Sequence, residues 1–525
     1  MKLSKLTFAI ATALTASVTT SAFAMDLYVD TKTKQIYTEA GAGRQKLGSF
    51  EQVQEDVPVK KGGEVSELRS KIELQDNQIK ALEEHAKASE EEGLVEIKKD
   101  GGIEFKSRDG NFKMAINGRM QVDSQVNVTN QVAPGVGANT QNTLDDGVAL
   151  RRGRLGIEGT FFKDTGYKFE YDFTRGNGTI GAGVTDAYLS YNVSKPLQLK
   201  FGAFKEPFSL EEATSNRYIT FIERNMITNT FVDNLNTYKM GIGAAYSEDR
   251  WQAAASLQTE PVGANVSSSV NTNGGANRNN GSGDTNWEAN ARVSGMPWME
   301  SKTKFLHTGL SGSYISLNNN YLANGSFSNG GVSFANGIGG NVDRTNILNT
   351  NNLTSGAKGT AAYRNADHFT RFGAETALVY GPFSTQAEYM QTDISGAGYK
   401  DESLSGYYGY VSYFVTGESR AYKSKTGAWD RLTPKHNFDG KGGLGAWEVA
   451  AGYDYINLND GVITGGQVST GKLGINWYVN PHVRVMANYV HALDINTAGS
   501  AGGARSKAFD AADLDIIETR LQLDW

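Results

Sequence analysis

The strongest indication of the fold is IETRLQLDW, residues 517–525. Mainly apolar side chains stand at the odd positions from Ile517 to Trp525, and polar or charged side chains stand at the even positions. Because the side chains of a strand alternate between its two faces, this stretch has one apolar and one charged face. A soluble protein could use such a strand at the edge of a sheet. The fold therefore depends on whether the rest of the chain repeats the pattern.

Fifteen further segments show strand-like patterns between turns or polar loops. The sixteen predicted strands are 112–128, 148–160, 166–173, 184–193, 197–205, 237–247, 250–258, 285–296, 304–317, 364–380, 382–393, 404–416, 444–457, 462–478, 482–494 and 512–525. An even number of strands lets a meander close with both ends on one side, as in bacterial outer-membrane barrels. We therefore expect an all-β fold: a 16-stranded antiparallel transmembrane β-barrel with an N-terminal periplasmic coiled-coil extension.

The lengths of the connections support this order of strands. Short turns, such as Gly381-Pro382, fall where the strand count places the periplasm. Long loops rich in Asn, Gly and Ser, at 259–284 and 318–363, fall on the other side, which predicts solvated external loops. The exception is 417–443, a long connection that the count assigns to the periplasm.

The alternation also assigns an inner and an outer face. On the strand 112–128, Lys113, Asn117, Arg119 and Gln121 lie opposite mainly apolar residues. Lipid cannot satisfy the backbone groups of an open sheet edge, so the sheet has to close. A barrel of this size encloses water rather than a packed core, which predicts a pore.

The N-terminus has the pattern of a secretory signal peptide over residues 1–24. A basic start precedes an apolar stretch from Leu6 to Val18, and Ala22-Phe23-Ala24 fits the cleavage signal. The apolar stretch is shorter than the about 20 residues that a membrane-spanning helix needs. We expect export and a mature chain that begins at Met25. The sequence has no Cys for lipid attachment or disulfides.

A heptad pattern follows within the predicted extension, residues 25–92. Apolar residues recur at alternating spacings of three and four, including Leu68, Ile72, Ile79 and Leu82, with Gln75 in the same seam. This pattern predicts a coiled coil over about 64–92, ahead of a barrel domain at 93–525. A single amphipathic helix packed on the domain is the alternative. We expect a homotrimer whose extension lies in the periplasm, where it could contact the cell wall.

Composition and charge exclude other classes of function. The 61 Gly and the 47 Tyr and Phe fit an antiparallel β protein with many turns. A formal net charge of −6 gives no electrostatic basis for binding nucleic acid. The six His form no motif with a nucleophile, which argues against an outer-membrane enzyme. We expect no catalytic residue, no metal and no cofactor.

The connection from Glu206 to Asn236 is too apolar for a solvated loop. It holds ten large apolar side chains: Phe208, Leu210, Tyr218, Ile219, Phe221, Ile222, Met226, Ile227, Phe231 and Val232. We expect it to fold into the barrel and narrow it; packing on a neighbouring subunit is the alternative. The charges that would then meet a solute are Glu211, Glu212, Arg217, Glu223 and Arg224.

Several wall residues could meet the same solute. Alternation directs Arg119, Arg152, Arg154 and Asp186 inward, whereas Arg151 stands at a strand end and is ambiguous. Guanidinium groups bind phosphate and carboxylate oxygens bidentately, so several of them near one constriction would form an anion site. Each could instead be an ordinary solvated or salt-bridged lining residue.

At these positions the sequence resembles a known family. The resemblance is carried by LRRGRLGIEG (150–159), YKFEYDF (167–173), LKFGAFKEPFSLEEATS (199–215), ITFIERN (219–225), GAWEVAAGYDY (445–455) and GINWYVNPHVRVMANYVHA (474–492). Together they resemble the phosphate-selective porin O and P family of Gram-negative outer membranes. The resemblance implies sixteen strands, a trimer, and an inward third loop that carries an anion site.

The resemblance also implies which residues bind the solute. The substrate-binding residues that it implies are Arg119, Arg151, Arg152, Asp186, Glu212, Arg217 and Arg224. Glu212 stands where the family's phosphate channels have a central lysine, and only Arg344 remains of the arginines expected around 338–347. A carboxylate in place of an ammonium reverses the local field, which weakens the case for tight phosphate binding.

The expected function is an outer-membrane porin with a water-filled channel for passive diffusion of small hydrophilic solutes. Anions such as phosphate or polyphosphate are the expected solutes. The alternatives are a channel for small carboxylates, a general-diffusion porin, or a structural envelope trimer. The expected partners are the homotrimer's other subunits, outer-membrane lipid, small anionic solutes and the cell wall, without nucleic acid.

Overall fold

The chain forms two units in the computed structural model, Met1–Ala88 and Ser89–Trp525. The structure describes residues 25–32, 35–50, 63–91, 95–97, 102–107, 109–131, 143–174, 183–233, 238–262 and 286–525. The predicted signal peptide, 1–24, lies outside the described residues. Within those ranges, no helix is both long and apolar enough to cross a membrane.

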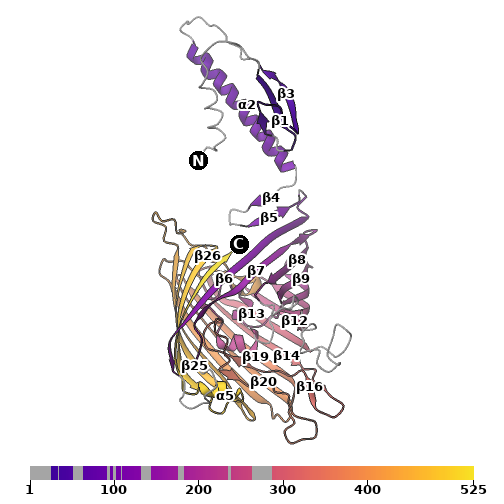
Figure 1. The fold of residues 1–525 in the computed structure, drawn as a ribbon, viewed down its shortest axis with the longest axis vertical. Helices are drawn as coiled ribbons and strands as arrows, with labels where there is room; N and C mark the ends of the chain where they lie inside the picture. Colours follow the sequence, from indigo (N-terminus) through magenta and orange to yellow (C-terminus); the bar gives the residue numbers. More distant parts are fainter. Residues whose placement is uncertain are drawn as a thin grey trace. The chain divides into compact units, whose positions relative to one another are not determined.

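The N-terminal unit combines a small sheet with a long helix (Figure 1). Strand β1 (Met25–Asp30) pairs antiparallel with β2 (Ile36–Tyr37) and with β3 (Arg44–Phe50). Helix α2 spans Gly63–Glu91, close to the predicted coiled-coil segment. Its side chains from 70 to 84 are all exposed, including the apolar ones of the heptad seam. The helix agrees with the sequence pattern, and its self-association stays a prediction.

The second unit is a closed barrel of sixteen antiparallel strands, as predicted. The strands are β6 (Phe112–Gln131), β7 (Gly147–Phe161), β8 (Thr165–Asp172), β9 (Val184–Asn192), β10 (Leu197–Lys205), β11 (Tyr238–Ser247), β12 (Trp251–Pro261), β13 (Trp287–Ser301), β14 (Lys304–Ser316), β19 (Asn365–Tyr380), β20 (Phe383–Ala397), β21 (Glu402–Phe414), β24 (Ala446–Asp460), β25 (Ile463–Asn480), β26 (Val483–Asn496) and β27 (Asp513–Asp524). The last strand pairs with the first, with Leu521 opposite Val122. Two short strands, β4 (Val95–Ile97) and β5 (Ile103–Lys106), precede them, and β5 pairs with β6.

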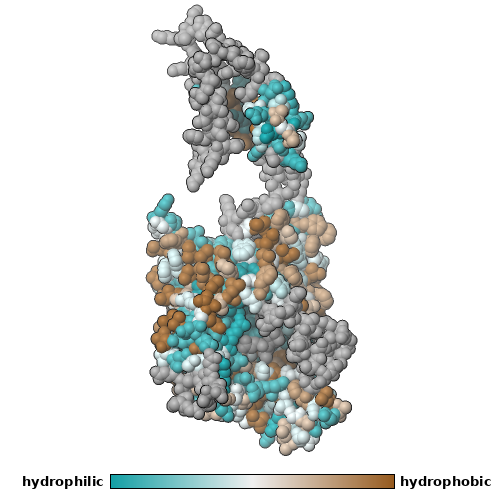
Figure 2. Space-filling model, viewed as in Figure 1, coloured by the Kyte–Doolittle hydropathy of each residue, from teal (hydrophilic) through white to brown (hydrophobic). Residues whose placement is uncertain are grey.

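The two faces of the wall follow the predicted alternation. On β27, Ile517 and Leu521 are exposed on the outside, whereas Glu518 and Arg520 are buried inside. Apolar residues cover much of the outer face of the barrel in Figure 2. The alternation thus places an apolar surface on the outside of the barrel and polar side chains toward the lumen.

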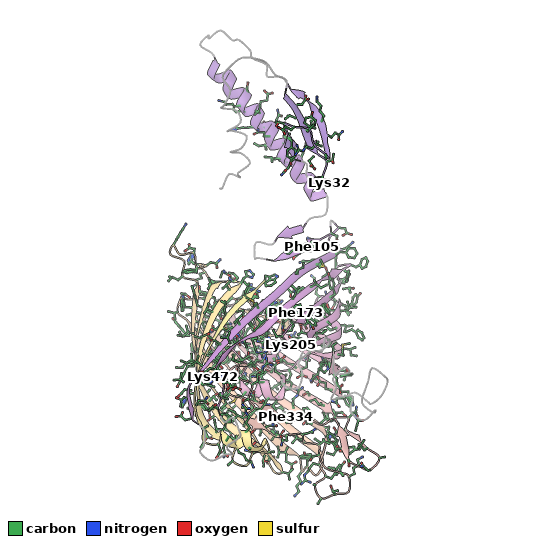
Figure 3. The ribbon with its side chains drawn as sticks, in the orientation of Figure 1. Lys32, Phe105, Phe173, Lys205, Phe334 and Lys472 are labelled. Atoms are coloured by element: carbon green, nitrogen blue, oxygen red, sulfur yellow. The ribbon has the colours of Figure 1, made fainter. Side chains whose placement is uncertain are left out.

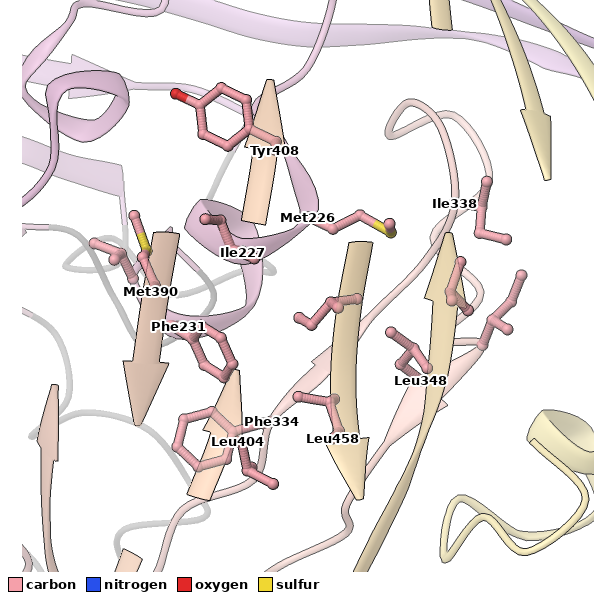
Figure 4. Close-up of a cluster of buried hydrophobic side chains, with 14 of the residues drawn as sticks. Met226, Ile227, Phe231, Phe334, Ile338, Leu348, Met390, Leu404, Tyr408 and Leu458 are labelled. Atoms are coloured by element: carbon pink, nitrogen blue, oxygen red, sulfur yellow. The ribbon is translucent and has the colours of Figure 1, made fainter. Parts of the chain in front are cut away.

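The connection 206–236 folds into the barrel, as predicted, and we call it the constriction loop. It contains α3 (Leu210–Ala213) and α4 (Met226–Phe231), and both helices are mostly buried. Figure 4 shows Met226, Ile227 and Phe231 of α4 beside apolar side chains of β20, β21 and β24. Burial of these side chains holds the loop inside the lumen.

The loop at 318–363 is only partly solvated, which contradicts part of the expectation from its composition. Five side chains of this loop are at most 5% exposed and pack against α4 and the wall: Phe334, Ile338, Ile347, Leu348 and Leu353. The average composition conceals them because they are few among many Asn, Gly and Ser. Most of the other predicted external loop, 259–284, lies outside the described residues.

The long connection 417–443 joins β21 to β24 on the side of the short turns. It contains β22 (Tyr422–Lys423), the 3-10 turn η7 (Ser424–Thr426) and β23 (Ala428–Trp429). Trp429 is buried and donates from Nε1 to Oε1 of Gln386 on β20, at 2.6 Å. Its backbone N–H lies 3.3 Å from Oγ1 of Thr214, next to α3. This connection therefore folds back into the barrel and reaches the constriction loop.

Candidate functional site

A β-bulge in β7 directs two consecutive arginines into the lumen. Arg152 lies opposite Gln121 of β6 and Leu150 lies opposite Val122, so Arg151 has no opposite residue. The extra residue of a bulge interrupts the alternation of side chains. Arg151 therefore reaches the constriction loop, where its Nε lies 2.7 Å from Oε1 of Glu223. The period-two alternation of side chains in the sequence could not reveal that Arg151 and Arg152 both point inward.

Three arginines surround Glu170, an inward residue of β8. Arg154 Nη1 lies 2.8 Å, Arg119 Nη2 3.1 Å and Arg217 Nη2 3.9 Å from its carboxylate oxygens. Arg154 also binds Asp172, with Nε 2.7 Å from Oδ2. The segment YKFEYDF contains both acids at inward positions, so alternation alone could have identified them.

A second group of three arginines surrounds Glu223 of the constriction loop. Besides Arg151, Arg520 Nη2 lies 2.7 Å and Arg152 Nη1 3.6 Å from its Oε1. Arg520 also binds Asp123 of β6, with Nε 2.7 Å from Oδ1. Burial alone would raise the pKa of Glu223, but the three guanidinium groups hold its pKa well below the ordinary value.

Amide side chains join the two groups into one network. Arg152 donates to Oε1 of Gln121 at 2.9 Å, and Gln121 donates to Gln522 of β27 and to the carbonyl of Asn216. Arg119 donates to the side chain of the same Asn216. We call these charged side chains the basic network. Its members are the six arginines Arg119, Arg151, Arg152, Arg154, Arg217 and Arg520 and the four acids Asp123, Glu170, Asp172 and Glu223. The network therefore has a surplus of two positive charges.

Asp186 and Glu212 lie outside the basic network. Asp186 forms an ion pair with Lys168 of β8, with Nζ 3.0 Å from Oδ2. Glu212 is fully buried, with Oε1 2.7 Å from Lys205 Nζ and Oε2 3.3 Å from Arg224 Nε. Lys205, which is labelled in Figure 3, keeps part of its side chain exposed. The structure thus joins Arg119, Arg151, Arg152 and Arg217 and separates Asp186, Glu212 and Arg224 from them.

Acidic side chains gather on another part of the wall, six strands from β6 around the barrel. Gln386 of β20 donates to Glu211 Oε2 at 3.0 Å and to Glu388 Oε1 at 3.2 Å. Tyr408 also donates to Glu388, at 2.5 Å. Glu211 and Glu388 therefore share Gln386 as a donor, on a part of the wall separate from the basic network.

One group of residues in the described ranges has the composition of a metal site. His491, Asp513 and Asp515 bring their ligand atoms within 4.8 Å of one another near the external ends of β26 and β27. His491 and Asp515 are hydrogen-bonded to each other at 2.8 Å. The group contains none of the residues of the basic network.

Comparisons with known proteins agree with this architecture. The model of the family described as phosphate-selective porin O and P matches residues 115–525. Porin O of Pseudomonas aeruginosa is 30% identical over 419 residues, which cover 76% of this chain and 87% of the relative. An uncharacterized protein of Caulobacter vibrioides is 26% identical over 397 residues, 75% of this chain and 71% of the relative.

Solved structures of other proteins match this chain in part. OmpT, an outer membrane protein of Vibrio cholerae, superposes with a TM-score of 0.46 at 12% identity and covers 79% of this chain and 98% of that chain. An anion-selective porin from Comamonas acidovorans has a TM-score of 0.45 at 10% identity, with 79% of this chain and 100% of that chain covered.

Proposed function

Because the chain belongs to the phosphate-selective porin O and P family of outer-membrane porins, we propose that its channel selects small anions through the basic network. The observation that carries the proposal is the surplus of positive charge in the basic network, whose arginines stand on β6, β7 and β27 and in the constriction loop. Charges of one sign at a narrow part of a channel attract counter-ions and repel ions of the same sign.

The chemistry of the network suits oxyanions. Guanidinium groups present planar pairs of donors that match the oxygens of phosphate or a carboxylate. Arg151 and Arg217 are the most accessible members of the network, with 18% and 14% of their side chains exposed. We therefore expect these two to meet the solute first, with Arg119 and Arg152 behind them.

Affinity for phosphate is expected to be modest. The six guanidinium groups already bind four carboxylates, so an entering anion competes with Glu170 and Glu223 for the same donors. Glu212 stands at the position of the family's central lysine and is itself buried between two cations. Passage of phosphate, polyphosphate or small carboxylates by diffusion fits this arrangement better than tight capture.

The assembly is part of the proposal. We infer a homotrimer in which the heptad seam of α2, over about 64–92, forms a parallel coiled coil. The exposure of Ile72, Ile79 and Leu82 supports this, because apolar seams of isolated helices are normally covered by a partner. The extension 25–92 would then lie in the periplasm, within reach of the cell wall, ahead of the barrel domain 93–525.

Recordings from planar bilayers test this function. The purified protein should produce single-channel currents in triplets of steps, with a reversal potential that indicates anion preference in a KCl gradient. Added phosphate should reduce the chloride current. A cation-selective reversal potential, or a chloride current indifferent to both phosphate and dicarboxylates, would remove the basis for an anion site.

A further inference from the structure

Side chains of the barrel wall hold the constriction loop by its backbone. At the start of the loop, Glu388 of β20 accepts hydrogen bonds from the N–H groups of Leu210 at 3.2 Å and Glu211 at 2.8 Å. The first N–H groups of a helix have no partner within the helix, so they need one outside it. Glu388 provides that partner for α3 from a strand that is distant in sequence.

Arginines bind the loop's carbonyl groups in the same way. Arg484 of β26 donates to the carbonyl oxygens of Ile219 at 2.8 Å and Thr220 at 3.2 Å. At the end of the loop, Arg371 of β19 donates to the carbonyl of Phe231 at 2.8 Å. Hydrogen bonds that involve an ionised group are stronger than neutral ones. The loop is therefore attached to the wall at its beginning, middle and end.

These wall side chains have little surface left for a solute. Glu388, Arg371 and Arg484 are each at most 4% exposed. Arg371 is also ion-paired with Glu206 at 2.8 Å, and its guanidinium lies 4.8 Å from the centre of the Phe208 ring. Their polar groups are used within the protein, whereas Arg151 and Arg217 of the basic network keep 18% and 14% of their side chains exposed.

We propose that Glu388, Arg371 and Arg484 are positioning residues, which determine the aperture of the channel by fixing the backbone of the constriction loop and do not bind the solute. The inference rests on the proposed channel function. It assigns aperture and charge selection to different sets of side chains, so a change in one set should alter the size of the current and a change in the other should alter its ion preference.

The substitution Glu388→Gln tests this with the smallest change of shape. The amide nitrogen of Gln cannot accept a hydrogen bond, so one of the two N–H groups at the start of α3 loses its acceptor. We expect an altered and noisier open-channel current with an unchanged reversal potential in a KCl gradient. Glu300→Gln is the matched control, because Glu300 is exposed at the periplasmic end of β13 and pairs with Lys304. It should change neither quantity.

A distance measurement tests the same inference without current. Because the native chain has no Cys, Ala213→Cys in α3 and Val411→Cys on the outer face of β21 would carry the only two spin labels. Glu388→Gln should broaden the distribution of distances between them. If that variant does not fold, both measurements can use Arg371→Lys instead. This substitution keeps the positive charge but removes the paired N–H donors of the guanidinium group.

The outcomes separate this inference from the proposed function. An unchanged current together with an unchanged distance distribution would overturn it, and so would a shifted reversal potential at an unchanged current, because the side chain would then act on the solute. Absence of any channel in the native protein would contradict the proposed function instead.

Discussion

The buried arginines of the barrel include two sets, which differ in whether they bind the backbone carbonyls of the constriction loop. On β6 and β7, Arg119, Arg152 and Arg154 bind carboxylates and amide side chains in a network with surplus positive charge. On β19 and β26, Arg371 and Arg484 donate to backbone carbonyls of the constriction loop. An inward arginine in a barrel is therefore no evidence of a solute site until its partners are known.

Arg520 binds both carboxylates and the backbone of the constriction loop, so we expect its removal to cause the largest loss of stability. It binds Asp123 and Glu223 and also donates to the carbonyl of Ile222 in the loop. Arg520→Met leaves Asp123 buried without its cation, and breaking a buried ion pair in this way costs about 3–5 kcal/mol. Urea unfolding of the refolded protein in detergent micelles, followed by Trp fluorescence, measures the loss.

Arg520→Lys is the matched control for that experiment, because it retains the charge. It should lose less stability than Arg520→Met. Equal losses in the two variants would mean that the shape of the side chain, rather than its charge, stabilises this part of the barrel.

Inversion of one charge in the basic network should have the next largest effect. Arg152→Glu reduces the surplus of two positive charges to zero. We expect the ratio of chloride to potassium permeability to fall on the order of tenfold, which corresponds to about 1.4 kcal/mol. Reversal potentials measure this ratio. Arg250→Glu, in an exposed periplasmic turn, should leave it nearly unchanged, and an equal fall there would refute a localised selectivity site.

Substitution of Asp186 should have a smaller effect, which distinguishes this residue from the basic network. It is paired with Lys168 rather than with the arginines of the basic network. Asp186→Asn should therefore change block by phosphate about twofold or less, as expected for a partly solvated ion pair. Titration of phosphate into single-channel recordings gives the block. A change in phosphate block as large as the one that Arg152→Glu causes would place Asp186 in the solute site after all.

The extension should affect the channel least. Ile79→Lys puts a charge into the predicted seam of α2, and we expect the trimer to dissociate at a lower temperature in a gel-shift assay. The reversal potential should remain that of the native protein. Glu83→Lys, which does not occupy the seam, is the control. A trimer of native stability in Ile79→Lys would count against the coiled coil.

Most of the fold could be predicted because each barrel strand can be recognised from the alternation of its own side chains. Each strand alternates between lipid and lumen, so Ile517 and Arg520 could be assigned to opposite faces from their order alone. The apolar constriction loop was also recognisable, because ten large apolar side chains cannot remain in solvent. The loop at 318–363 was not recognisable, since its few apolar residues are diluted by Asn and Gly.

The candidate site was predicted only in part, for two physical reasons. The bulge at Arg151 depends on the pairing of β6 with β7 and is invisible in a single strand. The acids around the arginines come from different elements: Glu170 from β8, Glu223 from the constriction loop and Asp123 from β6. Which acid meets which arginine is decided by proximity in space and not by spacing along the chain.

The amino-acid order therefore determined the sixteen strands, their inner and outer faces and the inward position of the third loop, because alternation and local hydrophobicity are properties of single segments. The tertiary structure alone decided the use of the inward charges. Arg152 and Arg484 look alike in sequence, but one joins a carboxylate network and the other binds a loop backbone. Desolvation inside the barrel favours partners within hydrogen-bonding distance, and only the folded loops bring those partners there.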